Sequence, residues 1–336
     1  MLKRKILFFT APKEIRIVED EISPPGKGQV LVQAILSAIS PGTEMLVYRG
    51  QFPNIAVDSV FSGLADNFAY PMKYGYSNVG RVIEIGEGVD RQWLDRLVFS
   101  FQPHTSHYLA ELPSLLFIPE GILPESACFF PNAETAVNLV QDAAPLIGER
   151  VMVLGQGIIG LLTSALLMRF PLESLVCVDF FPMRREAASG LGIKDVLDPS
   201  HLDFELKAKR ILKSGADISL ELTGSPLALN SAIALTAYSG RIVIGSWYGE
   251  KRAPIDLGGS FHRSRIKLIS SQVSTISPEL SGRWDKCRRY ETVWDALRLI
   301  EPQKWITHRF FIDKAADAYQ LLDNDPQDAI QIVLEY

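Results

Sequence analysis

The 336-residue sequence predicts an α/β protein in which a doubly wound parallel sheet is joined to a β-rich part. Two observations lead to this prediction. Between residues 133 and 273, short apolar β-type runs alternate with helical patterns, as in a parallel sheet built from βαβ units. Residues 1–132 instead contain β-type runs separated by turns. We therefore expect one domain at residues 133–273 and a β-rich domain that combines residues 1–132 with residues 274–336.

The β-rich part is marked by apolar runs at residues 1–9, 30–36 and 79–85. Clusters of glycine and proline, such as residues 24–26 and 86–88, separate these runs as turns. The first run is basic and then apolar, but its apolar stretch is too short for a secretion signal. We therefore expect a first β-strand there.

The expected strands of the parallel sheet are residues 151–154, 175–178, 218–222, 241–245 and 266–270. After position 274 the spacing of apolar residues predicts amphipathic helices at residues 292–300 and 314–322. The run at residues 329–334 predicts a closing strand that returns to the β-rich domain.

The first parallel strand leads into the glycine pattern Gly155-x-Gly157-x-x-Gly160, and an apolar helical run follows at residues 161–168. Gly155 permits a sharp turn, Gly157 has no side chain to block a pyrophosphate, and Gly160 lets the helix pack close to the strand. The N–H groups at the helix N-terminus can then bind the phosphates. Strand, glycine turn and helix together predict a dinucleotide-binding unit of the Rossmann type.

An acidic residue at the end of the second parallel strand indicates which dinucleotide is bound. Asp179 lies 24 positions after Gly155 (179 − 155), close to the ~20 expected for the carboxylate that binds the adenosine ribose. A carboxylate bonds a free 2′-hydroxyl and repels a 2′-phosphate, which favours NAD. Arg184 and Arg185 follow shortly after it and could pair with a phosphate, so NADP stays an alternative.

Composition limits the expected partners and location. The net charge of −5, with scattered Lys and Arg, predicts neither nucleic acid nor a membrane as partner. The basic run at residues 283–289 is interrupted by Asp285 and is interpreted as a solvated helix face. No apolar run reaches the ~18 residues of a membrane helix. The cysteines Cys128, Cys177 and Cys287 form no CxxC pair, which predicts a reducing, cytoplasmic location.

Local motifs along the whole chain resemble the medium-chain dehydrogenase/reductase superfamily, which includes the alcohol dehydrogenases. Residues 39–44 and 75–77 stand where its zinc-containing members carry Cys-x-Thr/Ser-Asp and Gly-His-Glu motifs. Residues 82–96 resemble their barrel strand and Gly-Asp-Arg turn. The resemblance implies that the β-rich domain is GroES-like and catalytic, and that the parallel sheet belongs to a Rossmann domain.

The resemblance also implies most of the cofactor contacts. Thr135 matches the threonine near the nicotinamide, and Arg184 matches a basic residue on the adenosine side. A homodimer built by the nucleotide-binding domains is implied as well, with residues 266–270 near the edge of the sheet. The expected cofactor-binding residues are Thr135, Gly155, Gly157, Ile158, Ile159, Gly160, Asp179, Arg184, Thr223 and Gly245.

The zinc ligands of the superfamily are replaced in this chain. Pro41, Tyr76 and Ser77 stand at the positions of the zinc-binding Cys, His and Glu, and the third-ligand region offers only Asn132 and Glu134. A catalytic zinc needs three protein ligands, and proline cannot bind a metal while tyrosine and serine bind zinc poorly. We therefore expect a protein without zinc.

Hydroxyl groups would then have to carry the proton that accompanies hydride transfer. Thr43 stands at the superfamily's proton-relay hydroxyl, and Tyr76 stands at a zinc-ligand position. We expect both to be catalytic and to face the nicotinamide carbon that carries the hydride. The alternative is that Tyr76 only fills the vacated zinc volume and that Thr43 caps a turn.

Other polar and aromatic residues are expected to have structural roles. Glu44 is expected to anchor a loop, as the matching acid does in relatives. His104 and His107 have the spacing of a metal pair on a helix, but they lie in a β-like stretch flanked by proline, which favours packing or surface roles. Three aromatic residues could line a pocket for a bulky or aromatic substrate, although core or interface positions are favoured: Trp247, Tyr248 and Trp284.

These expectations predict a zinc-independent, NAD(P)-dependent oxidoreductase that transfers a hydride between the cofactor and a secondary alcohol or ketone. Within the superfamily, residues 40–50 and the pair Gly75-Tyr76 most resemble the branch of bacteriochlorophyllide hydroxyethyl dehydrogenase. Two alternatives stay open. One is an enoyl or quinone reductase, and the other is a dinucleotide-binding protein without catalytic activity.

Overall fold

The computed structural model describes residues 2–52 and 69–336, so Met1 of the predicted first strand lies outside the described residues. The described chain forms two compact units. One unit comprises Met1–Pro131 with Leu297–Tyr336, and the other comprises Asn132–Ala296.

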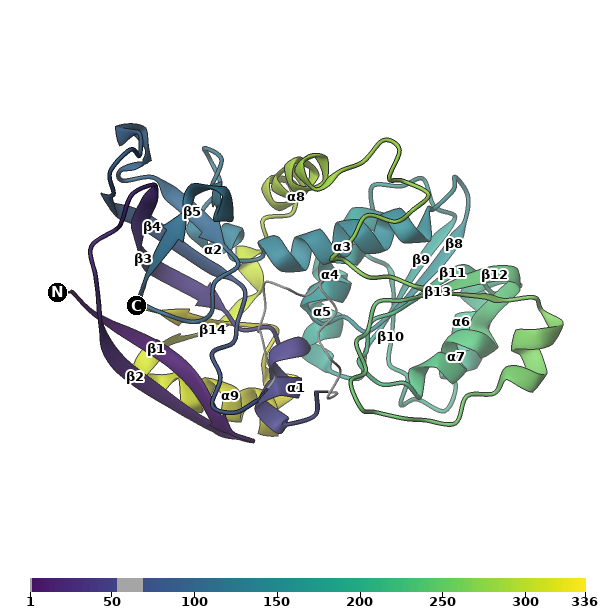
Figure 1. Cartoon of the computed structure of the whole chain (residues 1–336). Coiled ribbons are helices and arrows are strands. Elements are labelled where there is room, and N and C mark those ends of the chain that lie inside the picture. The colour runs from purple at the N-terminus through teal and green to yellow at the C-terminus, as the bar shows by residue number, and fades with distance from the viewer. Residues whose placement is uncertain (1, 53–68) are drawn as a thin grey trace. The chain divides into compact units, whose positions relative to one another are not determined.

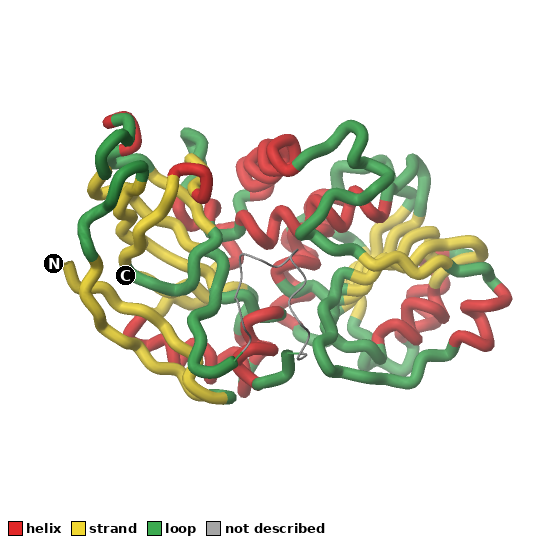
Figure 2. The backbone as a smooth tube through the Cα atoms, viewed as in Figure 1, coloured by secondary structure: helices red, strands yellow, loops and turns green. Residues whose placement is uncertain are grey.

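A parallel sheet forms the centre of the unit Asn132–Ala296, as the alternating pattern predicted (Figures 1 and 2). Its strand order is β10-β9-β8-β11-β12-β13, and every neighbouring pair is parallel. This order has the switch point of doubly wound sheets between β8 and β11, where such folds bind their ligands. The strands are β8 (Arg150–Leu154), β9 (Ser174–Val178), β10 (Asp195–Leu197), β11 (Ala216–Glu221), β12 (Thr236–Ile244) and β13 (Lys267–Ser270).

Helices cover both faces of this sheet, because right-handed crossovers on the two sides of the switch point place them on opposite faces. Figure 1 shows α6 and α7 side by side, and both bury apolar side chains against the same face. The helices of this part of the chain are α3 (Phe130–Ala143), α4 (Ile158–Leu167), α5 (Pro182–Gly190), α6 (Phe204–Leu212), α7 (Ala228–Leu235) and α8 (Lys286–Ile300).

The other unit is β-rich, as predicted. Its main sheet has the order β14-β15-β3-β4-β5-β7, with β6 paired to β3, and a separate hairpin joins β1 to β2. The closing strand β15 pairs with β3, so the predicted return to the β-rich part is confirmed. The strands are β1 (Leu2–Ala11), β2 (Glu14–Ile22), β3 (Gln29–Ala38), β4 (Asn78–Ile85), β5 (Leu97–Ser100), β6 (His107–Glu111), β7 (Leu115–Phe117), β14 (Ile306–Phe311) and β15 (Gln331–Glu335).

The helices of the β-rich unit are α1 (Thr43–Arg49), α2 (Pro124–Ala127) and α9 (Ala315–Asn324). The core between α1 and α9 is aromatic. Tyr319 of α9 meets Phe9 edge to face, with ring centroids 5.3 Å apart, and its ring lies 5.4 Å from that of Tyr48 in α1. This packing fixes α1, the helix that carries Thr43 and Glu44.

Within residues 2–52 and 69–336, no helix is both long enough and apolar enough to cross a membrane.

Candidate active site and cofactor site

The glycine loop after β8 has the geometry that a bound dinucleotide needs. A Cβ on Gly160 would lie 1.9 Å from the Gly155 carbonyl oxygen, and Gly155 itself has φ +94°. Both positions therefore require glycine. Apart from Gly157's own chain neighbours, the nearest protein atom to a Cβ placed on it would be Nη1 of Arg184, at 3.7 Å, so the space that a side chain would fill is open. The loop fits a pyrophosphate lying over Gly157 at the start of α4, where Ile158 and Ile159 begin the helix.

Asp179 lies directly after β9 and is buried. Its Oδ2 accepts a hydrogen bond from the Gln156 backbone N–H at 2.7 Å, and its Oδ1 accepts one from the Phe181 N–H at 2.8 Å. The carboxylate thus joins the glycine loop to the start of α5. Since an ionised carboxylate has roughly four acceptor positions, Asp179 keeps acceptor capacity for a ribose diol.

The two arginines that follow Asp179 differ in their contacts. The Arg184 guanidinium lies 4.8 Å from the centroid of the Phe181 ring and next to Gly157. Burial lowers the pKa of Arg184, while the Asp179 charge opposes that shift. Arg185 instead donates to the backbone oxygens of Asp179 and Phe180 at 2.9 and 2.6 Å, and it pairs with Asp198 at 3.0 Å. Arg185 is therefore used by the protein itself, and only Arg184 lies beside the glycine loop.

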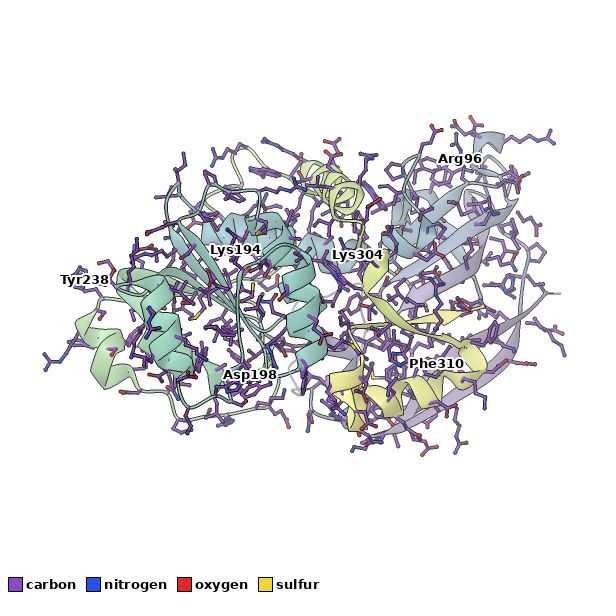
Figure 3. The ribbon with its side chains drawn as sticks, turned by 180° about the vertical axis from the view of Figure 1, so that it is seen from behind. Arg96, Lys194, Asp198, Tyr238, Lys304 and Phe310 are labelled. Atoms are coloured by element: carbon purple, nitrogen blue, oxygen red, sulfur yellow. The ribbon has the colours of Figure 1, made fainter. Side chains whose placement is uncertain are left out.

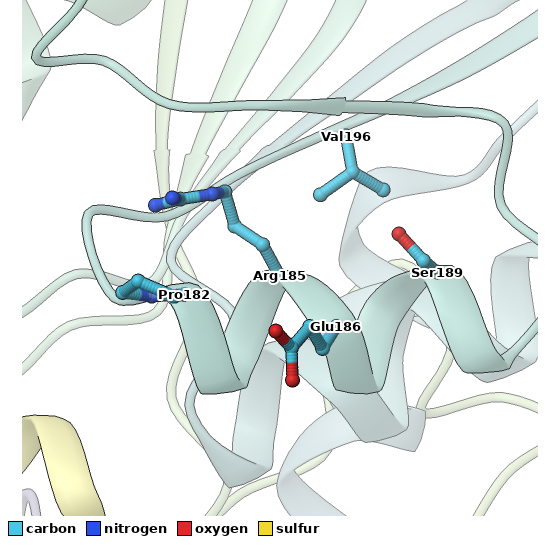
Figure 4. Close-up of a pocket in the computed structure, with 5 residues that line it drawn as sticks. All are labelled: Pro182, Arg185, Glu186, Ser189 and Val196. Atoms are coloured by element: carbon cyan, nitrogen blue, oxygen red, sulfur yellow. The ribbon is translucent and has the colours of Figure 1, made fainter.

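An open depression of about 400 Å³ lies beside α5, and Figure 4 shows the side chains that line it. None of its lining residues belongs to the glycine loop, so the depression is separate from the expected pyrophosphate site over Gly157. The lining residues are Pro182, Arg185, Glu186, Ser189 and Val196.

Thr223 and Gly245 lie at the carboxyl ends of β11 and β12, next to the buried Glu221. The backbone N–H and hydroxyl of Thr223 both donate to Oε1 of Glu221, and the Gly245 N–H donates to the Glu221 carbonyl at 3.1 Å. A Cβ on Gly245 would lie 2.6 Å from side-chain carbons of Leu139 and Leu222. Both predicted residues therefore lie on the edge of the sheet where doubly wound folds bind nucleotides.

The predicted catalytic hydroxyls of Thr43 and Tyr76 lie together in the β-rich unit. The Tyr76 hydroxyl donates to Oγ of Ser40 at 2.5 Å, and the Thr43 side chain is a further hydrogen-bond partner. Burial, the largest cause, and the charge of Glu44 raise the pKa of Tyr76 to about 12. At neutral pH this phenol is protonated, which suits a proton donor.

At another replaced zinc position the hydroxyl has a structural partner. Ser77 is buried and donates to the Cys128 carbonyl oxygen at 2.5 Å, and Pro41 directly follows Ser40. Across the described parts of the chain, no three His, Cys, Asp or Glu side chains gather as a metal site would require. Glu134 of the third-ligand region is paired with Lys286 at 2.7 Å and with Arg289.

The interpretation of residues 283–289 as a solvated helix face is wrong for Arg289. Its side chain is fully buried, and it donates to Glu134, Asn138 and the carbonyl oxygen of Thr275 at 3.1, 2.6 and 3.1 Å. Arg283 and Arg288 are exposed, as predicted. The run therefore has one buried arginine that joins α8 to α3 and to the chain segment after β13.

His104 has a larger role than its sequence context indicated. Its ring is fully buried, with Nε2 2.9 Å from Oε2 of Glu44 and Nδ1 2.6 Å from Oγ of Ser37. The prediction that Glu44 anchors a loop is confirmed, since its Oε1 accepts from the Ser40 N–H at 2.9 Å. His107 is half-buried and contacts Ser106 at 3.0 Å. No sequence motif connects His104 with Glu44, which lies 60 positions away.

The aromatic candidates are divided between core and surface. Tyr248 packs against the core of the parallel-sheet unit and donates to Oε2 of Glu221 at 2.5 Å. Trp247 is 42% exposed, and the Trp284 ring lies under the Arg288 guanidinium at 4.1 Å. Thr135 is half-buried in α3, in the turn that also carries Asn132 and Glu134.

Comparison with known proteins agrees with the fold and with the glycine loop. A family model described as zinc-binding dehydrogenase matches residues 159–287. The chain is 26% identical to D-guloside 3-dehydrogenase of Escherichia coli K12, over 98% of this chain and 99% of that protein. It is 28% identical to (R,R)-butanediol dehydrogenase of Bacillus subtilis, over 72% of this chain and 77% of that protein.

Among solved structures, the chain is similar to a protein of Escherichia coli CFT073 described as a short chain alcohol dehydrogenase complexed with NADH. The TM-score is 0.79 and the identity is 20%, over 99% of both chains. Fold, glycine loop and relatives together make this protein an oxidoreductase. It belongs to the medium-chain dehydrogenase/reductase superfamily of alcohol dehydrogenase-like enzymes.

Proposed function

We propose that the protein transfers a hydride between a nicotinamide cofactor and a secondary alcohol or its ketone without a zinc ion. The observation that carries this proposal is the hydroxyl cluster of Tyr76, Ser40 and Thr43. The resemblance implies that Tyr76 replaces a zinc ligand of the zinc-containing members. The cofactor would supply or accept the hydride. Tyr76 would give its proton to the carbonyl oxygen of the ketone, and Thr43 would hold that oxygen in place.

A substrate screen that follows NADH absorbance tests this proposal. Oxidation of secondary alcohols, or reduction of their ketones, would support it. Reduction of conjugated enones or quinones alone would favour an enoyl or quinone reductase. NADH binding without turnover of any substrate class would favour the non-catalytic dinucleotide-binding protein. The relatives named as dehydrogenases of a guloside and of butanediol make polyols and sugar derivatives the first substrates to screen.

Zinc independence is part of the same proposal and has its own measurement. Elemental analysis of purified protein after mild dialysis is expected to find far less than one zinc per chain, because Pro41, Tyr76 and Ser77 offer no zinc ligand set. Turnover is expected to persist in the presence of a chelator. About one tightly held zinc per chain would contradict this part of the proposal.

We propose that NAD is the preferred cofactor because Asp179 directs its carboxylate to the ribose. Asp179→Asn keeps an acceptor oxygen for the Gln156 N–H but removes the charge. We expect NADH affinity to fall about 10- to 100-fold, the loss expected for charge-assisted hydrogen bonds worth ~1.5–3 kcal/mol. NADPH affinity should fall less or rise. Titrations that follow cofactor fluorescence measure both, and Glu186→Gln is the control because it removes a charge from the exposed face of α5.

An unchanged ratio of NADH to NADPH affinity in Asp179→Asn would mean that other groups select the cofactor. Arg184 would then be the residue to test, because it is the arginine beside the glycine loop.

We propose a homodimer formed through the parallel-sheet units. β13 ends the order of strands in that sheet, and an edge strand can pair with a second copy. Tyr238 of β12, labelled in Figure 3, and Leu268 of β13 are 69% and 40% exposed. Light scattering at micromolar concentration is expected to give about twice the chain mass of 37.4 kDa. A mass near that of one chain would reject the dimer.

A further inference from the structure

One buried histidine contacts both segments that carry the candidate catalytic hydroxyls. His104 has no exposed surface, and its Nε2 lies 2.9 Å from Oε2 of Glu44. Glu44 is equally buried and lies in α1, next to Thr43. Through its other oxygen, Glu44 accepts the Ser40 N–H, and Ser40 is the residue that accepts the Tyr76 hydroxyl.

The same imidazole packs against the backbone that presents Tyr76. Gly75 has φ +117°, and a Cβ on it would lie 2.8 Å from Cδ2 of His104. The His104 backbone N–H also points to the Tyr74 carbonyl oxygen, at 3.5 Å. The ring therefore occupies the space beside Gly75, and the position of residues 74–76 depends on it. A larger residue at position 75 would have to displace the ring.

The hydrogen bonds around His104 are consistent with one arrangement of protons. With Glu44 as the acceptor, Nε2 of His104 is the donor in the bond between them. Nδ1 then accepts from the Ser37 hydroxyl at 2.6 Å, and Ser37 accepts from the Tyr336 hydroxyl at 2.6 Å. The Tyr319 hydroxyl donates to the same oxygen of Glu44. Each donor in this buried network has an acceptor, which holds the Glu44 carboxylate in a fixed position.

We propose that His104 is a positioning residue for the reaction: through Glu44 and Gly75 it fixes the Ser40–Thr43 turn and Tyr76 relative to one another. It acts neither as a metal ligand nor as a proton donor to the substrate. The proposal rests on the proposed function only in that Tyr76 and Thr43 carry out the proton transfer. Misplacement of reacting groups by ~1 Å can lower a rate by ~10²-fold, so a residue that acts through others can have a large effect on kcat.

The variants His104→Leu and His104→Gln separate hydrogen bonding from volume. Leucine keeps apolar bulk but loses both bonds, whereas the amide N–H of glutamine can still donate to Glu44. We expect His104→Leu to lower kcat by ~10- to 100-fold with little change in KM, and His104→Gln to recover a large part of that loss. His107→Gln is the matched control, because His107 is a half-buried histidine three positions away without a contact to Glu44.

Hydrogen exchange gives a readout that does not depend on activity. The Ser40 N–H is protected by its bond to Glu44, so a peptide covering residues 39–44 should exchange faster in His104→Leu than in the wild type. His104→Gln and His107→Gln should keep most of the protection. Circular dichroism checks that each variant is folded.

The possible results distinguish a failure of the positioning role of His104 from a failure of the proposed function. Unchanged exchange in a folded His104→Leu, or faster exchange with unchanged kcat, would overturn the positioning role. Equal losses in the leucine and glutamine variants, which have similar volumes, would overturn the part of the role that acts through the bond to Glu44. Wild-type turnover of Tyr76→Phe would instead overturn the proposed function. If both proposals hold, adding His104→Leu to Tyr76→Phe should cost much less than it costs in the wild type.

Discussion

Replacing Arg289 by leucine is expected to destabilise the folded chain by ~3–5 kcal/mol, because the substitution leaves Glu134 as a buried charge without its main partner. Arg289 and Glu134 are both buried, and their side chains are joined by bonds of 3.1 and 3.0 Å. The same guanidinium also donates to Asn138 and to the carbonyl oxygens of Val273 and Thr275. All of these acceptors would lose a donor. Lys286 keeps its bond to Glu134, which sets the expectation at the lower end of the range.

Urea denaturation followed by circular dichroism measures this effect as a shift in the unfolding midpoint. Arg288→Leu is the matched control, since Arg288 is the preceding residue, is exposed and stacks on Trp284. An exposed cation–π contact is worth ~0.5–1 kcal/mol, so the control should lose far less stability. Equal midpoints for the two variants would mean that the buried ion pair contributes no net stability.

Arg289 also lies in a helical spacing pattern that is present in the sequence but is not evident from the charge of the surrounding residues. On α8 the buried residues Arg289, Val293, Leu297 and Ile300 follow one another at spacings of four, four and three. This is the apolar stripe of an amphipathic helix, and Arg289 lies on it. The basic residues around Arg289 favoured an exposed helix face. The helical spacing of the buried residues instead predicts a buried position for Arg289.

The parallel sheet was predictable because its signals are local. Each strand is a short apolar run, and the glycine turn and Asp179 stand at fixed distances along one βαβ unit. β10 was missed because it has only three residues, Asp195–Leu197, too few to show a period. Residues close in sequence therefore defined the candidate cofactor site.

The His104–Glu44 pair was not predictable in the same way. Both residues lie outside strands that carry a regular pattern, and their contact depends on how α1 and the loop before β6 pack in the folded β-rich unit. Sequence separation gives no measure of that distance. The resemblance assigned Glu44 to a loop but offered no partner for it, so only the structure identified the histidine.

Replacing Tyr76 by phenylalanine is expected to lower kcat for ketone reduction by ~10²–10⁴-fold, the usual contribution of a positioned general acid. The substitution keeps the ring volume and removes only the hydroxyl that bonds Ser40 and Thr43. Cofactor affinity should not change, because the glycine loop and Asp179 are untouched. Thr43→Val, which removes the neighbouring hydroxyl at similar size, should also lower kcat.

The raised pKa of Tyr76 predicts different pH dependences for the two directions of the reaction. Ketone reduction needs the protonated phenol, so as far as Tyr76 is concerned its rate should stay level until the pH approaches the pKa of about 12. Alcohol oxidation needs the phenolate, whose fraction rises about tenfold per pH unit below that pKa, so its rate should increase with pH. Rate–pH profiles of the wild type and of Tyr76→Phe measure both effects, and the increase should disappear in the variant. Near-wild-type turnover of both Tyr76→Phe and Thr43→Val would assign the proton transfer to another group, because neither hydroxyl would then be needed.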